Sequence, residues 1–311
     1  MKKIGICEIG VYIPEIRVSN SSKKEKFNID DIFLEDKIGI KYTSKKSNIE
    51  DTSDMCKNAY HDLKNKIKFN KNDIKCIVVV TQNPDNDGIP HVSAILHKTL
   101  ELNEDCAVFD ISLGCSGYVY GLSIIESFMM TNEIYCGLLF TCDPYSKIVN
   151  VEDKNTSLLF GDAATVTLIN TNPLFISVGY KFNTRGLEYN TLYSKNRELI
   201  MDGRAVFNFS ATQVPKQIIS LLNIFNYNIN DIDLFLFHQG SKFIIDTLTK
   251  RLGINKAKIP FNIENFGNTV SSSIPILLSE NLNNNNNKIL LISGFGVGLS
   301  WASTIFKRIS L

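Results

Sequence analysis

The chain alternates short apolar runs with longer segments in which apolar residues recur every three or four positions. The apolar runs are bounded by polar residues and suit strands that are buried on both faces. They cover residues 74–81, 106–110, 135–141, 164–169, 234–237 and 289–293. The helical pattern covers residues 54–66, 118–130, 214–225, 243–252 and 274–282. Strands that alternate with helices predict an α/β protein whose layers surround a largely parallel sheet.

The second half of the chain repeats the arrangement of the first. Corresponding strands lie about 155 residues apart, which is too far for a solenoid repeat and fits a duplicated domain. The corresponding pairs are 76–81 with 234–237, 106–110 with 260–262, and 135–141 with 289–293. We therefore predict an N-terminal half, residues 1–171, and a C-terminal half, residues 172–311.

Charge and hydropathy argue against two classes of partner. The 33 basic and 32 acidic residues leave a formal net charge of +1, so no overall basic excess points to nucleic acid or to a membrane surface. No uncharged apolar stretch reaches the roughly 18 residues that a membrane helix needs. Glu8 interrupts the first apolar run, so we interpret the N-terminus as a core strand and not as a targeting segment. We expect a cytoplasmic protein.

The seven cysteines are an odd number and contain no CxxC pair. This pattern argues against a disulfide framework and against a cysteine-rich zinc site, and we predict no metal. Most of the cysteines lie in apolar strands, where they act as small buried hydrophobes. Cys115 differs, because it follows a strand and Gly114 and precedes a long apolar helix.

A cysteine at the start of a helix is a candidate nucleophile. The free amides and the positive end of the helix favour the thiolate over the thiol, and a thiolate is suited to thioester exchange. From this motif alone, a buried structural role for Cys115 is an equally good interpretation.

Two further motifs place polar side chains at turns. His238 follows the apolar strand 234–237, at the edge where α/β sheets bind ligands. Asn268 lies in a turn before a helix, at the position that mirrors Cys115 in the duplication. Taken singly, His238 could be a hydrogen-bonded core residue and Asn268 a helix N-cap.

Glycine-rich and acidic turns complete the set. The loop of residues 293–301 contains three alternating glycines, but too little chain follows it for a dinucleotide-binding fold. It is better interpreted as a loop that approaches a ligand closely and supplies backbone amides. Asp162, in the Phe-Gly-Asp segment 160–162, is expected to bond local amides in a structural role.

In this order, the motifs resemble those of the β-ketoacyl-acyl-carrier-protein synthase III family of the thiolase superfamily. The resemblance extends over nearly the whole chain, from Gly10 to Trp301. It implies the thiolase fold, in which two βαβαβαββ halves form five layers, and a homodimer. It also implies an acyltransferase that loads an acyl group from acyl-coenzyme A and condenses it with malonyl-acyl-carrier protein, without a cofactor besides the coenzyme A thioester.

The resemblance also assigns residues. The catalytic triad falls on Cys115, His238 and Asn268, and the backbone amides of Cys115 and Val297 would hold the oxyanion. The remaining assignments concern substrates: Phe33, Lys37 and Lys154 for coenzyme A, Lys242 for the carrier protein, and Ile89 for the floor of a dimer partner's acyl pocket. Lys37 stands where the family often has arginine, and Phe243 replaces an arginine used for carrier-protein docking. These departures leave the donor and the acceptor open.

Three functions are therefore compared. The first is a condensing enzyme that makes a 3-oxoacyl thioester. The second is an acyltransferase that uses Cys115 to move an acyl group from a thioester to a hydroxyl or amine of a small acceptor. The third is a thiolase-fold scaffold without catalysis. Asn268 favours the first, because simple transfer produces no enolate that needs stabilising, and the intact triad argues against the third.

Overall fold

The structure is a computed structural model and describes residues 3–309. Nine strands form the main sheet, which consists of two parts that meet where Ile6 of β1 pairs with Phe175 of β8. The first part runs in the order β5 (Ala107–Ile111), β4 (Cys76–Val80), β6 (Cys136–Cys142), β7 (Ala164–Asn170) and β1 (Gly5–Tyr12). The second continues with β8 (Phe175–Thr184), β13 (Ser300–Arg308), β12 (Ile289–Gly296) and β11 (Leu234–Phe237).

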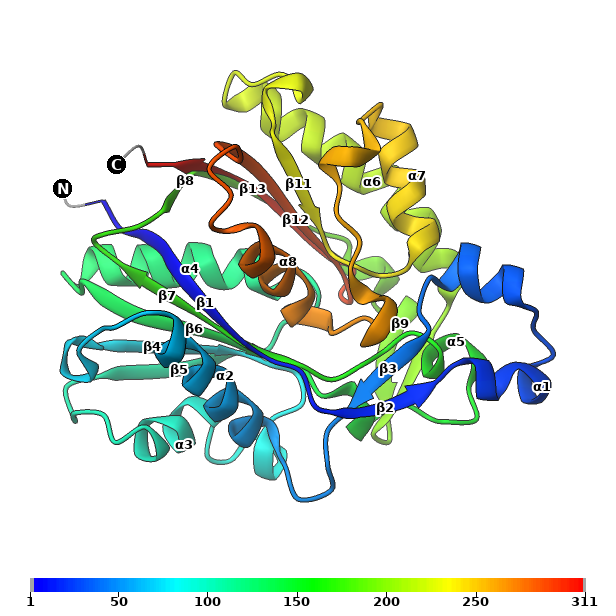
Figure 1. Ribbon diagram of the computed structural model, residues 1–311, viewed down its shortest axis with the longest axis horizontal. Coiled ribbons are helices and arrows are strands. Elements are labelled where there is room, and N and C mark those ends of the chain that lie inside the picture. Colours follow the sequence, from blue (N-terminus) through cyan, green and yellow to red (C-terminus); the bar gives the residue numbers. More distant parts are fainter. Residues whose placement is uncertain (1–2, 310–311) are drawn as a thin grey trace.

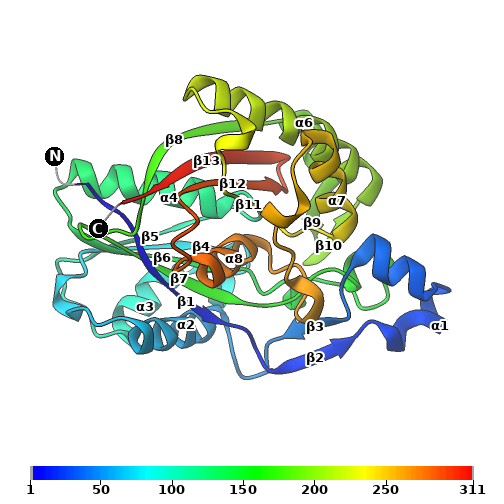
Figure 2. The same ribbon diagram turned by 45° about the horizontal axis from the view of Figure 1, so that its top comes forward.

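Six longer helices complete five layers (Figures 1 and 2). Helices α2 (Thr52–Lys66) and α3 (Val92–Thr99) cover the outer face of the first part of the sheet. Helices α4 (Gly117–Thr131) and α8 (Ser273–Asn281) lie between the two parts, and α6 (Gly203–Ile224) and α7 (Lys242–Leu252) cover the outer face of the second. This arrangement confirms the predicted five layers.

Two details of the sheet differ from the prediction. The sheet is mixed: only the β4–β5, β4–β6 and β11–β12 pairs are parallel. The connection from β12 to β13 is too short for a crossover and forces antiparallel pairing of these two strands. The strand predicted at 260–262 is also absent, since this segment runs without ladder bonds into a short 3-10 turn. The C-terminal half therefore lacks the third strand of the βαβαβαββ pattern.

Smaller elements extend from one end of the sheet (Figure 1). Strands β2 (Ile16–Ser19) and β3 (Tyr42–Lys45) pair with each other, as do β9 (Leu192–Lys195) and β10 (Glu198–Met201). The short helices are α1 (Lys24–Phe27) and α5 (Lys154–Ser157), with a π-helix at Phe33–Ile38. The boundary expected at residue 171/172 falls in the turn between β7 and β8, and the division into two domains stays a prediction. No helix among residues 3–309 combines the length and the apolar character needed to cross a membrane.

Helix α4 carries a buried carboxylate, Glu126. Glu126 is 6% exposed; its Oε2 accepts hydrogen bonds from Ser177 and Tyr180, both at 2.7 Å, whereas its Oε1 has no partner among the described residues. Burial raises the pKa of Glu126 to about 7 from its ordinary 4.5, and the two hydrogen bonds offset only part of this shift.

This shift predicts a pH-dependent stability. Between about pH 4.5 and pH 7 the folded protein holds a proton on Glu126 that the unfolded chain has lost, so the free energy of unfolding falls as pH rises through that interval. We expect Glu126→Gln to remove this fall and to exceed the wild type at pH 8 by on the order of 2 kcal/mol. Urea unfolding at pH 5 and pH 8 measures it, with the exposed Glu104→Gln as control. An equal change in the free energy of unfolding between pH 5 and pH 8 for wild type and Glu126→Gln would refute the assignment.

Candidate active site

The nucleophile turn joins β5 to α4 and packs against the glycine-rich end of β12. Cys115 is 4% exposed. A Cβ atom added at Gly296 would lie 2.7 Å from the Cys115 sulfur, and one at Gly294 would lie 2.6 Å from the Cys115 carbonyl oxygen. Only glycine therefore lets this strand end approach the turn, which is the close backbone approach expected for this loop.

Two backbone amides are directed at the sulfur. The backbone N–H groups of Val297 and of Cys115 itself lower the pKa of the thiol and so favour its ionised form. They are the two amides expected to form the oxyanion hole, and one comes from each half of the chain. Their catalytic role stays a prediction.

The expectation of a resting thiolate is wrong. Burial raises the pKa of the Cys115 thiol to about 12, with a smaller contribution from the Asp143 carboxylate, and the two amides only partly offset this. The effect of the apolar surroundings exceeds that of the helix terminus, because the free-energy cost of removing a thiolate from water is larger than the stabilisation that two amides provide. Cys115 is a neutral thiol at neutral pH.

His238 is also buried and neutral. It follows β11 and is 3% exposed, and burial lowers its pKa to about 3. Its Nδ1 lies 2.8 Å from the Ser273 hydroxyl oxygen, and a backbone hydrogen bond to Val270 partly offsets the fall in pKa. The Ser273 hydroxyl donates to the Val270 carbonyl at 3.1 Å and therefore accepts from Nδ1, so we infer that Nδ1 carries the ring proton and that Nε2 is the proton acceptor.

The Asn268 side chain is oriented by a hydrogen bond to its oxygen atom. Its Oδ1 accepts a hydrogen bond from the Val270 amide at 2.9 Å, which leaves the two Nδ2 hydrogens as donors. Val270 has φ +54°, a left-handed conformation that costs a β-branched residue about 1–2 kcal/mol. The fold tolerates this strain at a residue whose amide orients Asn268 and whose carbonyl contacts His238.

The Phe-Gly-Asp segment supports Asn268 from the first half. The Asn268 backbone bonds Leu159 and Gly161 at 2.8 and 3.0 Å. A Cβ added at Gly161 would collide with the Phe266 carbonyl, and one at Gly267 would lie 2.8 Å from the Leu159 carbonyl. Two similar Phe-Gly turns, one from each half, thus lie against each other.

Cys115, His238 and Asn268 line one cavity of about 330 Å³. Most of its wall is apolar, formed by Phe160, Leu192, Met201, Val206, Phe207 and Phe295. Lys37 and Arg204 are its exposed charged residues and mark its solvent end. Such a cavity suits a long ligand with an apolar part near Cys115 and an anionic part at the solvent end.

The predicted substrate-binding residues do not all meet at this cavity. Lys37 lines it, with its Nζ 3.7 Å from the centre of the Phe243 ring. Phe33 and Lys154 contact each other outside its lining, with the Lys154 Nζ 4.9 Å from the Phe33 ring centre. Lys242 bonds the Glu35 carbonyl at 3.0 Å and borders a separate cavity.

One further assignment lies apart from the site, and sequence reasoning missed two residues that line it. Ile89 is 84% exposed and lies in the loop before α3, away from the triad cavity of its own chain. Sequence reasoning missed Arg204 and Phe207, which the first turns of α6 bring to the cavity. Phe207 stacks on Phe243 with ring centres 4.8 Å apart. No local motif marks them.

Comparisons with known proteins agree with this geometry. A family model for 3-oxoacyl-[acyl-carrier-protein] synthase III matches residues 109–186, and the model for the C-terminal part of these enzymes matches residues 222–308. A β-ketoacyl-[acyl-carrier-protein] synthase III from Lactococcus lactis is 31% identical over 324 residues, covering 97% of this chain and 98% of that protein. The enzyme of the same name from Clostridium perfringens is 31% identical over 328 residues, covering 99% and 100%.

The chain belongs to the β-ketoacyl-acyl-carrier-protein synthase III family. A 2.1 Å crystal structure of a 3-oxoacyl-(acyl-carrier-protein) synthase III superposes with a TM-score of 0.91 at 27% identity, covering 99% of this chain and 100% of that one. Membership in the synthase III family confirms the predicted thiolase fold and the predicted class, an acyl-transferring condensing enzyme. The individual site residues stay predictions.

The buried thiol predicts a pH profile unlike that of a cysteine activated at rest. With a pKa near 12, the rate of Cys115 alkylation by iodoacetamide should rise about tenfold for each pH unit between 7 and 9, because the thiolate fraction rises in that way. Mass spectrometry of the Cys115 peptide measures the rate, and Cys115→Ala reports background labelling. A plateau below pH 7 would show a preformed thiolate.

The contact between Gly296 and the sulfur predicts a second result. Gly296→Ala should abolish acyl loading of Cys115, because the new methyl group would lie 2.7 Å from the sulfur. Intact mass spectrometry after incubation with acyl-coenzyme A measures loading. Gly186→Ala, where an added Cβ meets nothing within 4 Å, is the matched control. Loading of Gly296→Ala at the wild-type rate would contradict the observed packing.

Proposed function

We propose that Cys115 is acylated by an acyl-coenzyme A and that the acyl group is then condensed with malonyl-acyl-carrier protein to give a 3-oxoacyl product. One observation carries the proposal: Cys115, His238 and Asn268 line one narrow apolar cavity, and the Val270 amide leaves the Asn268 Nδ2 free to donate. The names of the relatives support a 3-oxoacyl product and an acyl-carrier protein as partner. We expect a cytoplasmic enzyme that uses no cofactor besides the coenzyme A thioester.

Loading begins with two neutral groups. The Cys115 thiol gives its proton to Nε2 of His238 as the sulfur attacks the thioester carbonyl. The oxyanion accepts hydrogen bonds from the Cys115 and Val297 amides. The bond to coenzyme A then breaks, and its thiolate leaves with the proton held by His238. This order needs no resting ion pair, which suits the opposed pKa shifts of Cys115 and His238.

Condensation uses Asn268. The malonyl carboxylate leaves as carbon dioxide, and its electron pair forms an enolate whose oxygen accepts a hydrogen bond from Nδ2 of Asn268. The enolate carbon attacks the acyl group, the bond to Cys115 breaks, and a proton from water restores the thiol. His238, the predicted second donor to the enolate, would act there only with a proton on Nε2.

The edge of the sheet supports the predicted homodimer. β5 is an outermost strand with a free edge, and Asp110 at its end accepts hydrogen bonds from the Val92 and Ser93 amides at 2.7 and 2.9 Å. These bonds hold the loop with the exposed Ile89 beside that edge. We propose that a second copy of the chain pairs at this edge.

The charged residues at the solvent end of the cavity are the proposed coenzyme A site. We propose that Lys37 and Arg204 bind the anionic end of coenzyme A. Phe33 and Lys154 would contact its adenine, and Lys242 the carrier protein.

A substitution of Asn268 distinguishes a condensing enzyme from a simple acyltransferase. Asn268→Ala should still be acylated, because thioester exchange needs only the thiol, His238 and two backbone amides. Its decarboxylative condensation should fall by about 10²–10³-fold, the usual effect of losing one oxyanion donor. Single-turnover kinetics measures both steps, with mass spectrometry for loading and carbon dioxide release for condensation.

Two control variants accompany this experiment. Cys115→Ala should lose both steps, and Asn132→Ala, an exposed asparagine at the end of α4, should keep both. Condensation by Asn268→Ala at the wild-type rate would disprove the enolate role. A wild-type enzyme that loads acyl groups but never decarboxylates a malonyl thioester would instead favour transfer to a hydroxyl or amine.

A further inference from the structure

The segment that directly follows β6, residues 143–147, contacts several parts of the candidate site. Four of its side chains bond other segments of the chain: Asp143, Tyr145, Ser146 and Lys147. Their partners lie after β4, at the start of α2, in the Phe-Gly-Asp segment and in the turn of residues 268–271. One short segment can therefore hold turns from both halves of the chain at fixed distances.

Asp143 makes the bond that crosses from one half to the other. Its side chain is fully buried. Oδ1 accepts a hydrogen bond from the Gln82 backbone amide at 2.6 Å, and Oδ2 accepts one from the Ser271 hydroxyl at 2.5 Å. Burial raises the pKa of Asp143 to about 6, and the two hydrogen bonds offset part of this shift, so the group is mostly ionised at neutral pH. Hydrogen bonds to an ionised group are stronger than those between neutral groups.

The first of these bonds leads to the nucleophile turn. The Gln82 Oε1 accepts a hydrogen bond from the Tyr145 hydroxyl at 3.0 Å, and a Cβ added at Gly114 would lie 2.6 Å from the same oxygen. The Gln82 side chain is therefore fixed against the residue that precedes Cys115. After burial, the charge of Asp143 is the next largest cause of the raised pKa of the Cys115 thiol, so this carboxylate also lies near the sulfur.

The second bond leads to Asn268. Ser271 directly follows Val270, whose amide orients the Asn268 side chain. Within residues 3–309, the bond to Asp143 is the only hydrogen bond found for the Ser271 hydroxyl, which is buried. The His238 ring is oriented by a different hydroxyl, on α8. A change at Ser271 should therefore disturb Asn268 more than His238.

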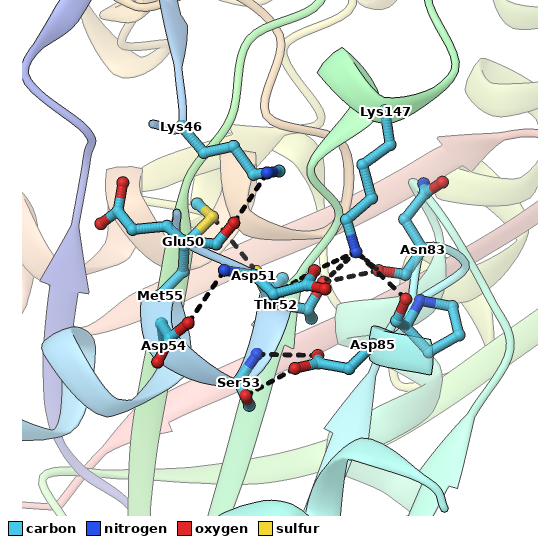
Figure 3. Close-up of polar contacts among 12 residues, drawn as sticks. Lys46, Glu50, Asp51, Thr52, Ser53, Asp54, Met55, Asn83, Asp85 and Lys147 are labelled. Carbon is cyan, nitrogen blue, oxygen red and sulfur yellow. Dashed lines mark hydrogen bonds and ion pairs between the residues drawn. The ribbon is translucent and has the colours of Figure 1, made fainter. Parts of the chain in front are cut away.

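Lys147 fixes the same connection at a further point. Figure 3 shows its side chain extending toward Asp51 and the backbone of Asn83. The Lys147 Nζ pairs with the Asp51 carboxylate and bonds the carbonyl oxygens of Asn83 and Pro84, both at 3.1 Å. The segment after β6 thus holds the turn after β4 at two places, and this turn is positioned before any substrate binds.

We propose that Asp143 is a positioning residue for condensation, because its carboxylate links the turn of Cys115 to the turn of Asn268. The inference rests on the proposed function and adds a residue to its second step. In that step the acyl group on Cys115 must lie beside an enolate that Asn268 holds, and a displacement of about 1 Å can cost about 100-fold in rate. Loading does not use Asn268, so loss of the link should slow condensation more than loading.

Ser271→Ala tests the link with the smallest change. Condensation by the acylated enzyme should fall by at least about tenfold, the effect of one hydrogen bond to a charged group, while loading stays within about twofold of the wild type. Single-turnover kinetics measures both steps, with mass spectrometry for loading and carbon dioxide release for condensation. Condensation at the wild-type rate, or an equal loss of both steps, would contradict the link.

Ser177→Ala is the matched control. The Ser177 hydroxyl also donates to a buried carboxylate, that of Glu126, at 2.7 Å, but this pair lies outside the cavity of the triad. Urea unfolding should show a loss of stability in both serine variants, whereas only Ser271→Ala should lose condensation. If Ser177→Ala loses condensation to the same extent, the effect is one of stability and the positioning role is wrong.

Substitutions of Asp143 separate its hydrogen bonds from its charge. Asp143→Asn keeps an oxygen for the Gln82 amide and an NH2 group beside the Ser271 hydroxyl, so it should retain most of the condensation that Asp143→Ala loses. Asp143→Asn should also raise the rate of Cys115 alkylation by iodoacetamide at pH 8, because one cause of the raised thiol pKa is removed. Condensation as slow as in Asp143→Ala, or an alkylation rate that does not rise, would overturn the proposal.

A double-mutant cycle shows whether the two side chains act through one contact. If they do, the combined variant Asp143→Ala with Ser271→Ala should condense about as slowly as Asp143→Ala alone. Losses that multiply would show separate effects and refute the link. If the wild type never decarboxylates a malonyl thioester, the proposed function itself fails, and this inference fails with it. If the wild type condenses and Ser271→Ala condenses equally well, only the inference fails.

Discussion

The contact between the Cys115 turn and the end of β12 is the constraint that organises the site. The turn belongs to the first half and the strand to the second, and Gly294 and Gly296 leave no side chain between them. The Val297 amide can reach the Cys115 sulfur only because the backbones approach so closely. Without this contact the nucleophile and one of its two amide donors would lie on separate layers. The helices α4 and α8 that fill the central layer hold this distance.

Burial then decides how the site can work. The apolar cavity that positions an acyl chain also keeps Cys115 protonated and His238 neutral. Hydrogen bonds in such a cavity are stronger than in water, so each donor has a larger effect once charge develops on the substrate. The resting Cys115 thiol is therefore protonated, and in the proposed mechanism its proton moves to His238 as the sulfur attacks the bound thioester. An inert thiol among seven cysteines also avoids side reactions with other electrophiles.

The sequence was informative where function depends on backbone geometry. Cys115, His238 and Asn268 each follow a strand or occupy a turn before a helix, and those signals are local. The thiolate prediction failed because a helix terminus can be identified from sequence, whereas the burial that opposes it arises from residues far away, such as Phe160 and Leu192.

Sheet direction and cavity walls were harder to predict for related reasons. The antiparallel β12–β13 pair follows from a short connection, which apolar runs alone do not reveal. Residues 260–262 have the composition of a strand but make no ladder bonds. Arg204 and Phe207 reach the cavity because α6 lies across its mouth, and a helix position far from every motif carries no such signal. The Lys242 side chain contacts Glu35 and Asp36, and no local signal in the sequence reveals these contacts.

The paired Phe-Gly turns have a consequence for how such a protein diversifies. Gly161 lies against Phe266, and Gly267 lies against Leu159, so each half restricts which residues the other can accept. After a duplication, two copies are usually free to drift apart. Here a side chain gained at either glycine would require a compensating change in the other half, because both turns hold the Asn268 backbone in position. We therefore expect substitutions at this seam to be constrained in both halves together.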